Sequence, residues 1–281
     1  MTTLDLDAYF ARIGHHGTRA PTLETLRAIS YAHVSSIPFE NVDVLLERPI
    51  ALEVEALEAK LVHGRRGGYC FEQNGLLLAV LEALGYEVRP LSARVRVGRA
   101  REVTPPRTHL CLRVELEGTS WLVDVGVGAW SLTGPIRLVL DEVQRTPHEP
   151  RRLVAEGAWE DLELRSPSAR LFHQIQLGDR WEDVCELTLE EMPPIDRVVA
   201  SWYTSTHPGS HFKDTLLVAR ATPSGRVTLR DDVLTRRAHD GSAESQTLSS
   251  RAALLAALAD TFGLALDPET RFSTPSLAAL R

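Results

Sequence analysis

Residues 66–74 of this chain read Arg66-Gly67-Gly68-Tyr69-Cys70-Phe71-Glu72-Gln73-Asn74. This stretch places a cysteine directly after two glycines and before an apolar segment, Leu76 to Leu81, whose pattern predicts a helix that stops at Gly85. A thiol in the first turn of a helix lies near the positive end of the helix dipole and near unpaired N–H groups, and both favour the reactive thiolate. Paired glycines allow the sharp bend and close approach that a positioned nucleophile needs. Cys70 is therefore a candidate nucleophile; the alternative is ordinary packing, the usual role of a lone cysteine.

A candidate base for this thiol, and a carboxylate to orient that base, lie on two expected strands. Residues 109–116 alternate as a half-buried strand does, and residues 121–125 form a second strand after a short turn. Asp124 lies among apolar neighbours, where an unpaired carboxylate would be costly. The residues therefore predict a relay in which Cys70 attacks, His109 takes its proton and Asp124 orients the imidazole.

The register of this hairpin limits the relay. A turn at Gly118-Thr119 places Arg113, not His109, opposite Asp124, so contact between His109 and Asp124 requires a bulge, a strong twist or a shifted turn. Structural alternatives stay open: a backbone carbonyl satisfies His109, and Asp124 caps a turn or pairs with Arg113. Cys111 shares a strand face with His109, but the sequence has no Cys-x-x-Cys pattern, so no metal site is expected.

Five segments in order make the chain resemble the arylamine N-acetyltransferases, in their bacterial form. They are Ile37-Pro38-Phe39-Glu40-Asn41, Arg66-Gly67-Gly68-Tyr69-Cys70, Thr108-His109, Val123-Asp124-Val125-Gly126 and residues 202–212. The second resembles the Arg-Gly-Gly-aromatic-Cys motif that carries the acetyl-accepting cysteine, and the next two resemble the family's His and Asp motifs. The last resembles the Ser-Thr-His-Pro-x-Ser-x-Phe segment of bacterial members. The resemblance spans nearly the whole chain and implies that Cys70, His109 and Asp124 are a catalytic triad.

The resemblance also implies the fold, an α+β arrangement of a helical bundle, an antiparallel β-barrel and an α/β lid around a papain/transglutaminase-like Cys-His-Asp core. The patterns divide the chain to match: 1–85 is helical and carries the nucleophile, 86–192 is strand-rich and carries His and Asp, and 193–281 is mixed. Expected helices cover 22–29, 52–61, 70–85 and 251–262. Expected strands cover 89–97, 109–116, 121–125, 160–164, 215–220, 226–229 and 233–234.

The activity implied by the resemblance is acetyl transfer from acetyl-CoA to arylamines, arylhydrazines or N-hydroxyarylamines. It proceeds by a ping-pong mechanism through an acetyl-cysteine, with acetyl-CoA as a co-substrate and without a metal. Small aromatic amines or hydrazines are the implied acceptors, and xenobiotic metabolism is the implied role.

Further residues receive supporting roles. The family favours an ion pair between Glu40 and Arg66 beside the nucleophile; the alternative is two unrelated surface charges. Three aromatic side chains are expected to line the acceptor pocket, since aryl groups stack on such rings: Phe39, Tyr69 and Trp130. Four residues are expected near coenzyme A: Gly126, Gly128, His207 and Ser210. Their alternatives are core packing, a plain turn or the bracing of their own segment.

Two departures from the family pattern concern the expected pockets. Ser201 stands where many members have asparagine, which leaves the hydrogen bonding of that segment open. Val127 and Trp130 lie in the loop after Asp124, where members often carry Phe-Gly-Gly. Because this loop commonly borders both substrates, acceptor preference is the least transferable inference.

Composition argues against several other classes of protein. The chain has 281 residues and a formal net charge of −7 without a long cationic block, so nucleic acid is not an expected partner. The run Leu76 to Leu81 is too short to span a bilayer, and the N-terminal residues lack the pattern of a secretion signal, so no membrane partner is expected. Three widely spaced cysteines, Cys70, Cys111 and Cys185, fit a reducing compartment and predict a cytoplasmic location.

Three other functions stay open. A cysteine hydrolase or a transglutaminase-like enzyme uses the same triad, because a triad specifies acyl transfer rather than the acceptor. A macrolactam-forming amide synthase, related to the transferases, takes a tethered polyketide thioester instead of acetyl-CoA. A non-catalytic binding module requires no special reactivity of Cys70. The match at Thr204 to Phe212 favours the transferase over the hydrolase.

Overall fold

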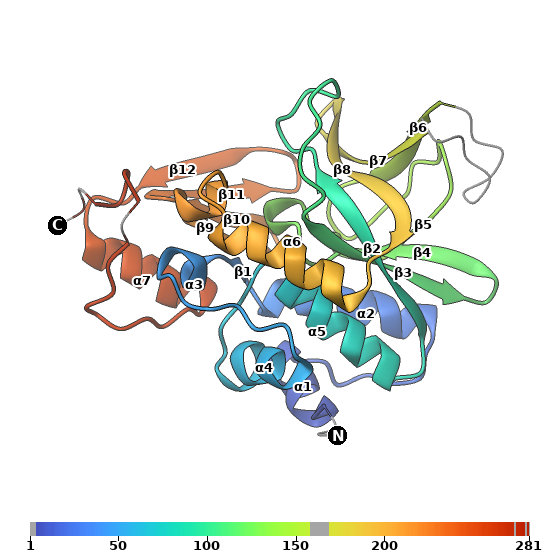
Figure 1. Cartoon of the computed structure of the whole chain (residues 1–281), viewed down its shortest axis with the longest axis horizontal. Helices are drawn as coiled ribbons and strands as arrows, with labels where there is room; N and C mark the ends of the chain where they lie inside the picture. The colour runs from blue at the N-terminus through green and yellow to red at the C-terminus, as the bar shows by residue number, and fades with distance from the viewer. Residues whose placement is uncertain (1–3, 158–168, 273, 279, 281) are drawn as a thin grey trace.

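The computed structural model describes residues 4–157, 169–272, 274–278 and 280. Figure 1 shows three parts: helices at the bottom, a curved sheet at the upper right and a flatter sheet with one helix at the left. The expected α+β fold is confirmed. In the part of the chain that is described, no helix combines the length and the apolar character that crossing a membrane requires.

The first part is mainly helical. Its elements are α1 (Leu6–Ile13), α2 (Leu23–Ser36), β1 (Phe39–Glu40), α3 (Val42–Leu45), α4 (Val54–Leu57), a π-helical segment (Glu58–His63) and α5 (Cys70–Ala83). The side chain of Thr22 caps α2 by accepting from the amide of Thr25. The central helix α5 begins at Cys70 and stops before Gly85, whose φ of 86° ends the helical path. Apolar residues of α5 pack between α1, α2 and the barrel strands.

Seven antiparallel strands form the second part, in the order β5-β4-β3-β2-β8-β7-β6. Their bounds are β2 (Glu87–Val95), β3 (His109–Leu116), β4 (Thr119–Val123), β5 (Ile136–Arg137), β6 (Arg151–Glu156), β7 (Arg170–Leu177) and β8 (Arg180–Glu191). The chain after β5 returns to β6, where the amide of Asp141 donates to the carbonyl of Leu153 at 2.8 Å. The two edges of the sheet therefore meet, and the expected barrel is confirmed.

Sequence patterning did not single out β6, β7 and β8. Charged residues interrupt the apolar alternation in Arg151–Glu156 (RRLVAE) and in Arg180–Glu191 (RWEDVCELTLEE). The expected strand at 160–164 lies outside the described residues.

The hairpin of β3 and β4 turns one residue earlier than predicted. Glu117 and Gly118 form the turn with φ of 52° and 72°, the combination that suits a two-residue hairpin loop. Arg113 therefore lies opposite Leu122, so the predicted register that put Arg113 opposite Asp124 is wrong. This shifted turn moves Asp124 toward the start of β3, where His109 lies.

The third part is a five-stranded antiparallel sheet in the order β1-β9-β10-β11-β12. Its later strands are β9 (Leu217–Thr222), β10 (Gly225–Arg230), β11 (Val233–Ala238) and β12 (Ala243–Thr247), and α7 (Arg251–Phe262) packs on it. Ser250 caps α7, and Gly263 ends it with a φ of 72°, which matches the helix expected over 251–262. Because β1 forms the edge of this sheet, the first and third stretches share it, and the divisions at residues 85 and 192 stay predictions.

A helix that the patterns did not identify, α6 (Pro194–Thr206), crosses the molecule in front of α5 (Figure 1). Pro194 is its first residue, a position that tolerates proline because no intrahelical N–H bond is lost there. β-branched residues such as Val198 and Val199 obscured its helical character.

Candidate active site

Cys70 lies at the start of α5, in the position that the sequence predicted. Its side chain is buried, with 4% of its surface exposed. Sγ donates to the carbonyl of Thr108 at 3.7 Å, and Thr108 directly precedes His109. The start of α5 therefore adjoins the start of β3, and the thiol lies near the end of β3 that carries His109.

Two glycines allow this approach. A Cβ on Gly67 would lie 2.0 Å from the carbonyl oxygen of Pro38, and one on Gly68 would lie 2.5 Å from Oε2 of Glu72. No other residue fits either position without moving backbone or a buried carboxylate. The loop before Cys70 is thus pressed against both β1 and its own helix.

His109 and Asp124 form a buried ion pair. Nε2 of His109 lies 2.7 Å from Oδ2 of Asp124, and each residue is 1% exposed. Burial opposes the charged imidazole, but the Asp124 carboxylate outweighs burial and raises the pKa of His109 well above its ordinary value. Burial likewise opposes the carboxylate, but the charge and hydrogen bond of His109 lower the pKa of Asp124.

Cys185 lies beside this pair, which the sequence did not predict. Donor atoms of His109, Asp124 and Cys185 lie within 4.8 Å of one another, and burial raises the pKa of the Cys185 thiol. The strand pairing explains why Cys185 lies near His109. Strands β3 and β8 flank β2, and each directs one of these two residues to the interior of the barrel. These donor types can bind a metal, but the short bond to Asp124 already occupies one nitrogen of His109.

Asn74 ties α5 to the loop that carries Asp124. Its Nδ2 donates to the carbonyl of Leu110 at 2.6 Å and to Oδ1 of Asp124 at 3.0 Å. Its Oδ1 accepts from the amide of Val125 at 3.0 Å. Sequence reasoning missed this residue, although its spacing of four from Cys70 places both on one face of a helix.

Gly126 contacts the nucleophile itself. A Cβ at this position would lie 2.7 Å from Cα of Cys70 and 2.6 Å from Nδ2 of Asn74. The loop after Asp124 therefore packs directly against the first turn of α5.

Substituting Gly126 with alanine should separate this loop from α5. We expect a loss of about 1–3 kcal/mol in the free energy of unfolding, because the added methyl overlaps backbone atoms. Urea denaturation measures it. The matched control is Gly134→Ala, where the added Cβ would lie 3.4 Å from Cδ of Pro147, an ordinary contact. Equal losses in the two variants would contradict this packing.

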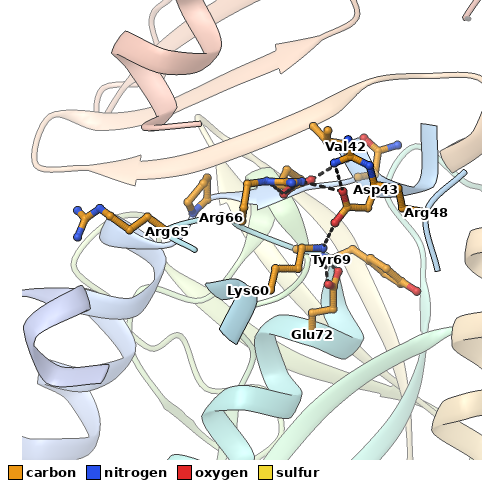
Figure 2. A network of polar contacts seen from close by, with 12 residues as sticks. Val42, Asp43, Arg48, Lys60, Arg65, Arg66, Tyr69 and Glu72 are labelled. Atoms are coloured by element: carbon orange, nitrogen blue, oxygen red, sulfur yellow. Dashed lines mark hydrogen bonds and ion pairs between the residues drawn. The ribbon is translucent and has the colours of Figure 1, made fainter. Parts of the chain in front are cut away.

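Glu40 and Arg66 form an ion pair beside the loop that precedes Cys70. Nη2 of Arg66 donates to Oε1 of Glu40 at 2.7 Å, and Nε donates to the same oxygen at 3.1 Å. The other oxygen of Glu40 accepts from the amide of Val42 at 2.6 Å. Glu40 is 1% exposed, so these are not unrelated surface charges. Arg65, by contrast, points away from this network (Figure 2).

The ion pair extends into a network that the sequence did not reveal. Lys60 bridges Asp43 at 2.7 Å and Glu72 at 2.6 Å, and Arg66 contacts Asp43 at 3.2 Å. Glu72, in the first turn of α5, accepts from the amide of Tyr69 at 3.0 Å. Burial raises the pKa of Glu72 to about 7, although Lys60 favours its charged form. The chain of contacts thus holds the residue before Cys70 (Figure 2).

Replacing Lys60 with methionine should destabilise the fold by about 3–5 kcal/mol, because two mostly buried carboxylates lose their shared cation. Guanidinium denaturation of the purified variant measures this. Lys213→Met is the control, since Lys213 lies 3.9 Å from Glu47 at the surface and such pairs contribute about 0–1 kcal/mol. Similar stabilities for the two variants would show that the network does not hold the loop.

The aromatic residues near the site pack on one another. The hydroxyl of Tyr69 lies 2.6 Å from Oγ of Ser201. Ser201, which stands where many family members have asparagine, therefore has a side-chain hydrogen-bond partner. The ring of Tyr69 lies 5.7 Å from that of Phe212, and the ring of Phe39 lies 6.1 Å from it. Tyr69 is fully buried. Trp130 is partly buried and packs against the barrel core.

His207 and Ser210 make their described contacts within their own segment. The ring of His207 stacks on Tyr203 with centroids 4.4 Å apart and accepts from the amide of Gly209 at 3.0 Å. The hydroxyl of Ser210 donates to the carbonyl of Thr204 at 2.6 Å. Gly128 has a φ of 66°, and a Cβ there would lie 3.4 Å from the ring of Phe39.

Comparisons with known proteins identify the family of this chain. Residues 22–271 match the N-acetyltransferase family model. An arylamine N-acetyltransferase from Mycolicibacterium smegmatis is 46% identical over 94% of this chain and 93% of its own length, and one from Escherichia coli (strain K12) is 42% identical over 93% and 89%. The solved arylamine N-acetyltransferase of M. tuberculosis superposes with a TM-score of 0.85 at 41% identity, covering 92% of this chain and 93% of that one. That of Mycobacterium marinum in complex with CoA superposes with a TM-score of 0.84 at 39% identity, covering 92% of both chains. On this evidence the chain belongs to the arylamine N-acetyltransferase family.

Proposed function

We propose that this protein transfers the acetyl group of acetyl-CoA to the nitrogen of arylamines, arylhydrazines or N-hydroxyarylamines. The observation that carries the proposal is the buried ion pair of His109 and Asp124 beside the helix that Cys70 begins. Family membership supports the choice of acyl donor, since one related structure was solved in complex with CoA.

In the first half-reaction, Cys70 passes its proton to His109 and attacks the thioester carbonyl of acetyl-CoA. A new bond joins Sγ to the acetyl carbon, and the bond from that carbon to the sulfur of coenzyme A breaks. The departing thiolate takes the proton from His109. Asp124 holds Nε2, so Nδ1 is the nitrogen that exchanges protons, and the buried carboxylate stabilises the charged imidazole.

In the second half-reaction, the amine nitrogen attacks the acetyl carbon of acetyl-Cys70. The nitrogen gives its proton to His109, the bond to Sγ breaks and Cys70 is regenerated. Each tetrahedral intermediate carries an oxyanion that needs donors. The amides of Cys70 and Phe71 lie in the first turn of α5, where N–H groups have no intrahelical acceptor, and we assign them this role.

The substrate contacts follow from the position of the loop after Asp124. Gly126 and Gly128 present backbone beside Cys70 and Phe39, which suits contact with the pantetheine arm of coenzyme A. We assign contacts with the remainder of coenzyme A to the segment that holds His207 and Ser210. We assign the acceptor wall to Phe39 and Trp130. Tyr69 is fully buried and supports this wall through Phe212.

The cellular setting belongs to the same proposal. The three cysteines are free and buried, which fits a reducing cytoplasm. Acceptors are small aromatic amines or hydrazines, which fits xenobiotic metabolism. Neither nucleic acid nor a membrane is an expected partner, given the net charge of −7.

Initial rates with varied acetyl-CoA and varied arylamine test the proposal. A ping-pong enzyme gives parallel lines in double-reciprocal plots, because the first product leaves before the second substrate binds. Continuous release of coenzyme A without an amine would indicate a hydrolase. Failure of acetyl-CoA to turn over with any arylamine would favour the amide synthase.

A further inference from the structure

The segment from Asp124 to Leu132 is a closed loop beside the nucleophile. The carbonyl of Asp124 accepts from the amide of Leu132 at 2.7 Å, which joins its two ends. Along its course Gly126 packs against Cys70, and its 3-10 turn, Gly128–Trp130, packs against β1, β9 and β10. The loop therefore lies where barrel, helix α5 and C-terminal sheet meet.

Two separate devices hold this loop. The near end, at Asp124 and Val125, is held from α5 by Asn74. The far end is held by two arginines from different sheets. Nη1 of Arg151, on β6, donates to the carbonyl of Trp130 at 2.9 Å, and Nη2 of Arg226, on β10, donates to the carbonyl of Ser131 at 2.9 Å.

One carboxylate joins the two arginines. Glu149 receives two hydrogen bonds from Arg226, each at 2.7 Å, and one from Arg151 at 3.2 Å. Burial opposes the charge on Glu149, but the hydrogen bonds and charges of Arg226 and Arg151 lower its pKa to about 2. Burial lowers the pKa of Arg151 to about 9, and the charge of Arg226 acts in the same direction. We call Glu149, Arg151 and Arg226 the arginine anchor.

The composition of the arginine anchor is costly for a purely structural element. Two guanidinium groups share one carboxylate in a region where Arg151 is fully buried and Arg226 is 5% exposed. Nε of Arg151 has no hydrogen-bond partner among the described residues. Apolar side chains of similar volume often stabilise such a position at least as well. Unlike apolar side chains, the two arginines donate hydrogen bonds in fixed directions. Outside the anchor, these bonds reach the carbonyls of Trp130 and Ser131.

We propose that the arginine anchor is a positioning element that fixes Trp130 for the acetyl acceptor, and that it governs the second half-reaction more than the first. This inference rests on the proposed function and names the residues that control its acceptor step. Asn74 holds the carboxylate of Asp124 from α5, a helix that carries no member of the anchor, so we expect the pairing of Asp124 with His109 to survive when the anchor is lost. The two half-reactions therefore respond differently to substitutions in the anchor.

The test compares Arg226→Gln with Arg236→Gln, an exposed arginine of the same C-terminal sheet. The amount of active enzyme is set by counting Cys70 acetylated by acetyl-CoA alone, and both half-reactions are then timed separately. We expect the KM for the arylamine in Arg226→Gln to rise about tenfold, with the rate of Cys70 acetylation changed less than about twofold. Arg226→Lys, which keeps the charge, recovers part of the loss, and Arg236→Gln behaves as the unsubstituted protein.

A competition experiment makes the result independent of folding yield. A one-ring and a two-ring arylamine are supplied together, and the ratio of the two acetylated products is measured for the unsubstituted protein, Arg226→Gln and Glu149→Gln. We expect this ratio to change about threefold or more in both variants. An unchanged ratio, or an equal fall in both half-reactions per active Cys70, overturns the inference and leaves the proposed function intact. If the unsubstituted protein does not become acetylated on Cys70, the proposed function fails and the inference falls with it.

Discussion

Replacing Cys70 with alanine should lower arylamine acetylation by about 10⁵–10⁶-fold, because the enzyme then has no sulfur to attack acetyl-CoA and carry the acetyl group. The side chain is small and lies at the first position of α5, so the fold should survive. The measurement is the acetylated product formed from acetyl-CoA and an arylamine, with circular dichroism as the check on folding.

Cys111→Ala is the matched control for this experiment. Cys111 is buried as Cys70 is, but its thiol donates to the carbonyl of Leu91 at 3.8 Å within the barrel. We expect that variant to keep most of its activity. Normal turnover by Cys70→Ala, or the same loss in a folded Cys111→Ala, would remove Cys70 from the mechanism.

Replacing Asp124 with asparagine should lower the rate of acetyl transfer about 10⁴-fold, with Cys70 still present. An amide cannot stabilise the charged imidazole and favours the wrong tautomer of His109, as in other triads. Single-turnover acetylation of Cys70 measures the loss directly. Asp183→Asn is the control, because Asp183 pairs with Arg101 at 2.6 Å rather than with His109. Equal effects in the two variants would exclude a special role for Asp124.

The same substitution has a signature in the pH dependence of stability. The folded pKa of His109 is raised above 6.5, so its contribution is complete below that pH and disappears as the pH rises through the raised value. The folded pKa of Asp124 is lowered below 3.8, so its contribution is complete above that pH and disappears as the pH falls through the lowered value. The difference in unfolding free energy between the unsubstituted protein and Asp124→Asn should therefore be largest between about pH 4 and 6.5, at about 3–5 kcal/mol. Urea denaturation across this range measures it, and a difference that does not vary with pH would contradict the ion pair.

Local sequence patterns predict many of the helices and strands. The start of α5, its glycine stop, the capped helices α2 and α7 and the strands β3 and β4 follow from apolar spacing and from residues such as Thr22, Ser250 and Gly263. The β3–β4 hairpin turns at Glu117-Gly118 rather than at the predicted Gly118-Thr119, because Glu117, although it is not a small residue, adopts a positive φ. Helix α6 and strands β6 to β8 were missed because β-branched or charged residues hide their periodicity.

The candidate triad came from motifs, whereas its supports depend on the tertiary structure. Asn74 shares a helix face with Cys70, so its spacing is a signal that sequence can carry. Cys185 reaches His109 only because the barrel brings β8 and β3 to one interior. Arg151 and Arg226 meet at Glu149 from two different sheets, and the bond from Arg226 to Glu149 joins residues 77 positions apart along the chain. No local pattern encodes such a meeting.

The proposed mechanism passes through a covalent acetyl-enzyme on Cys70. The most direct measurement is intact-protein mass spectrometry after mixing the enzyme with acetyl-CoA and no acceptor, followed by peptide mapping and then by addition of an arylamine. The predicted result is one acetyl group, located on Cys70 and discharged by the amine. An enzyme that stays unmodified while Cys70 reacts with an alkylating reagent, or an acetyl group on Cys111 or Cys185 instead, would exclude Cys70 as the acetyl carrier.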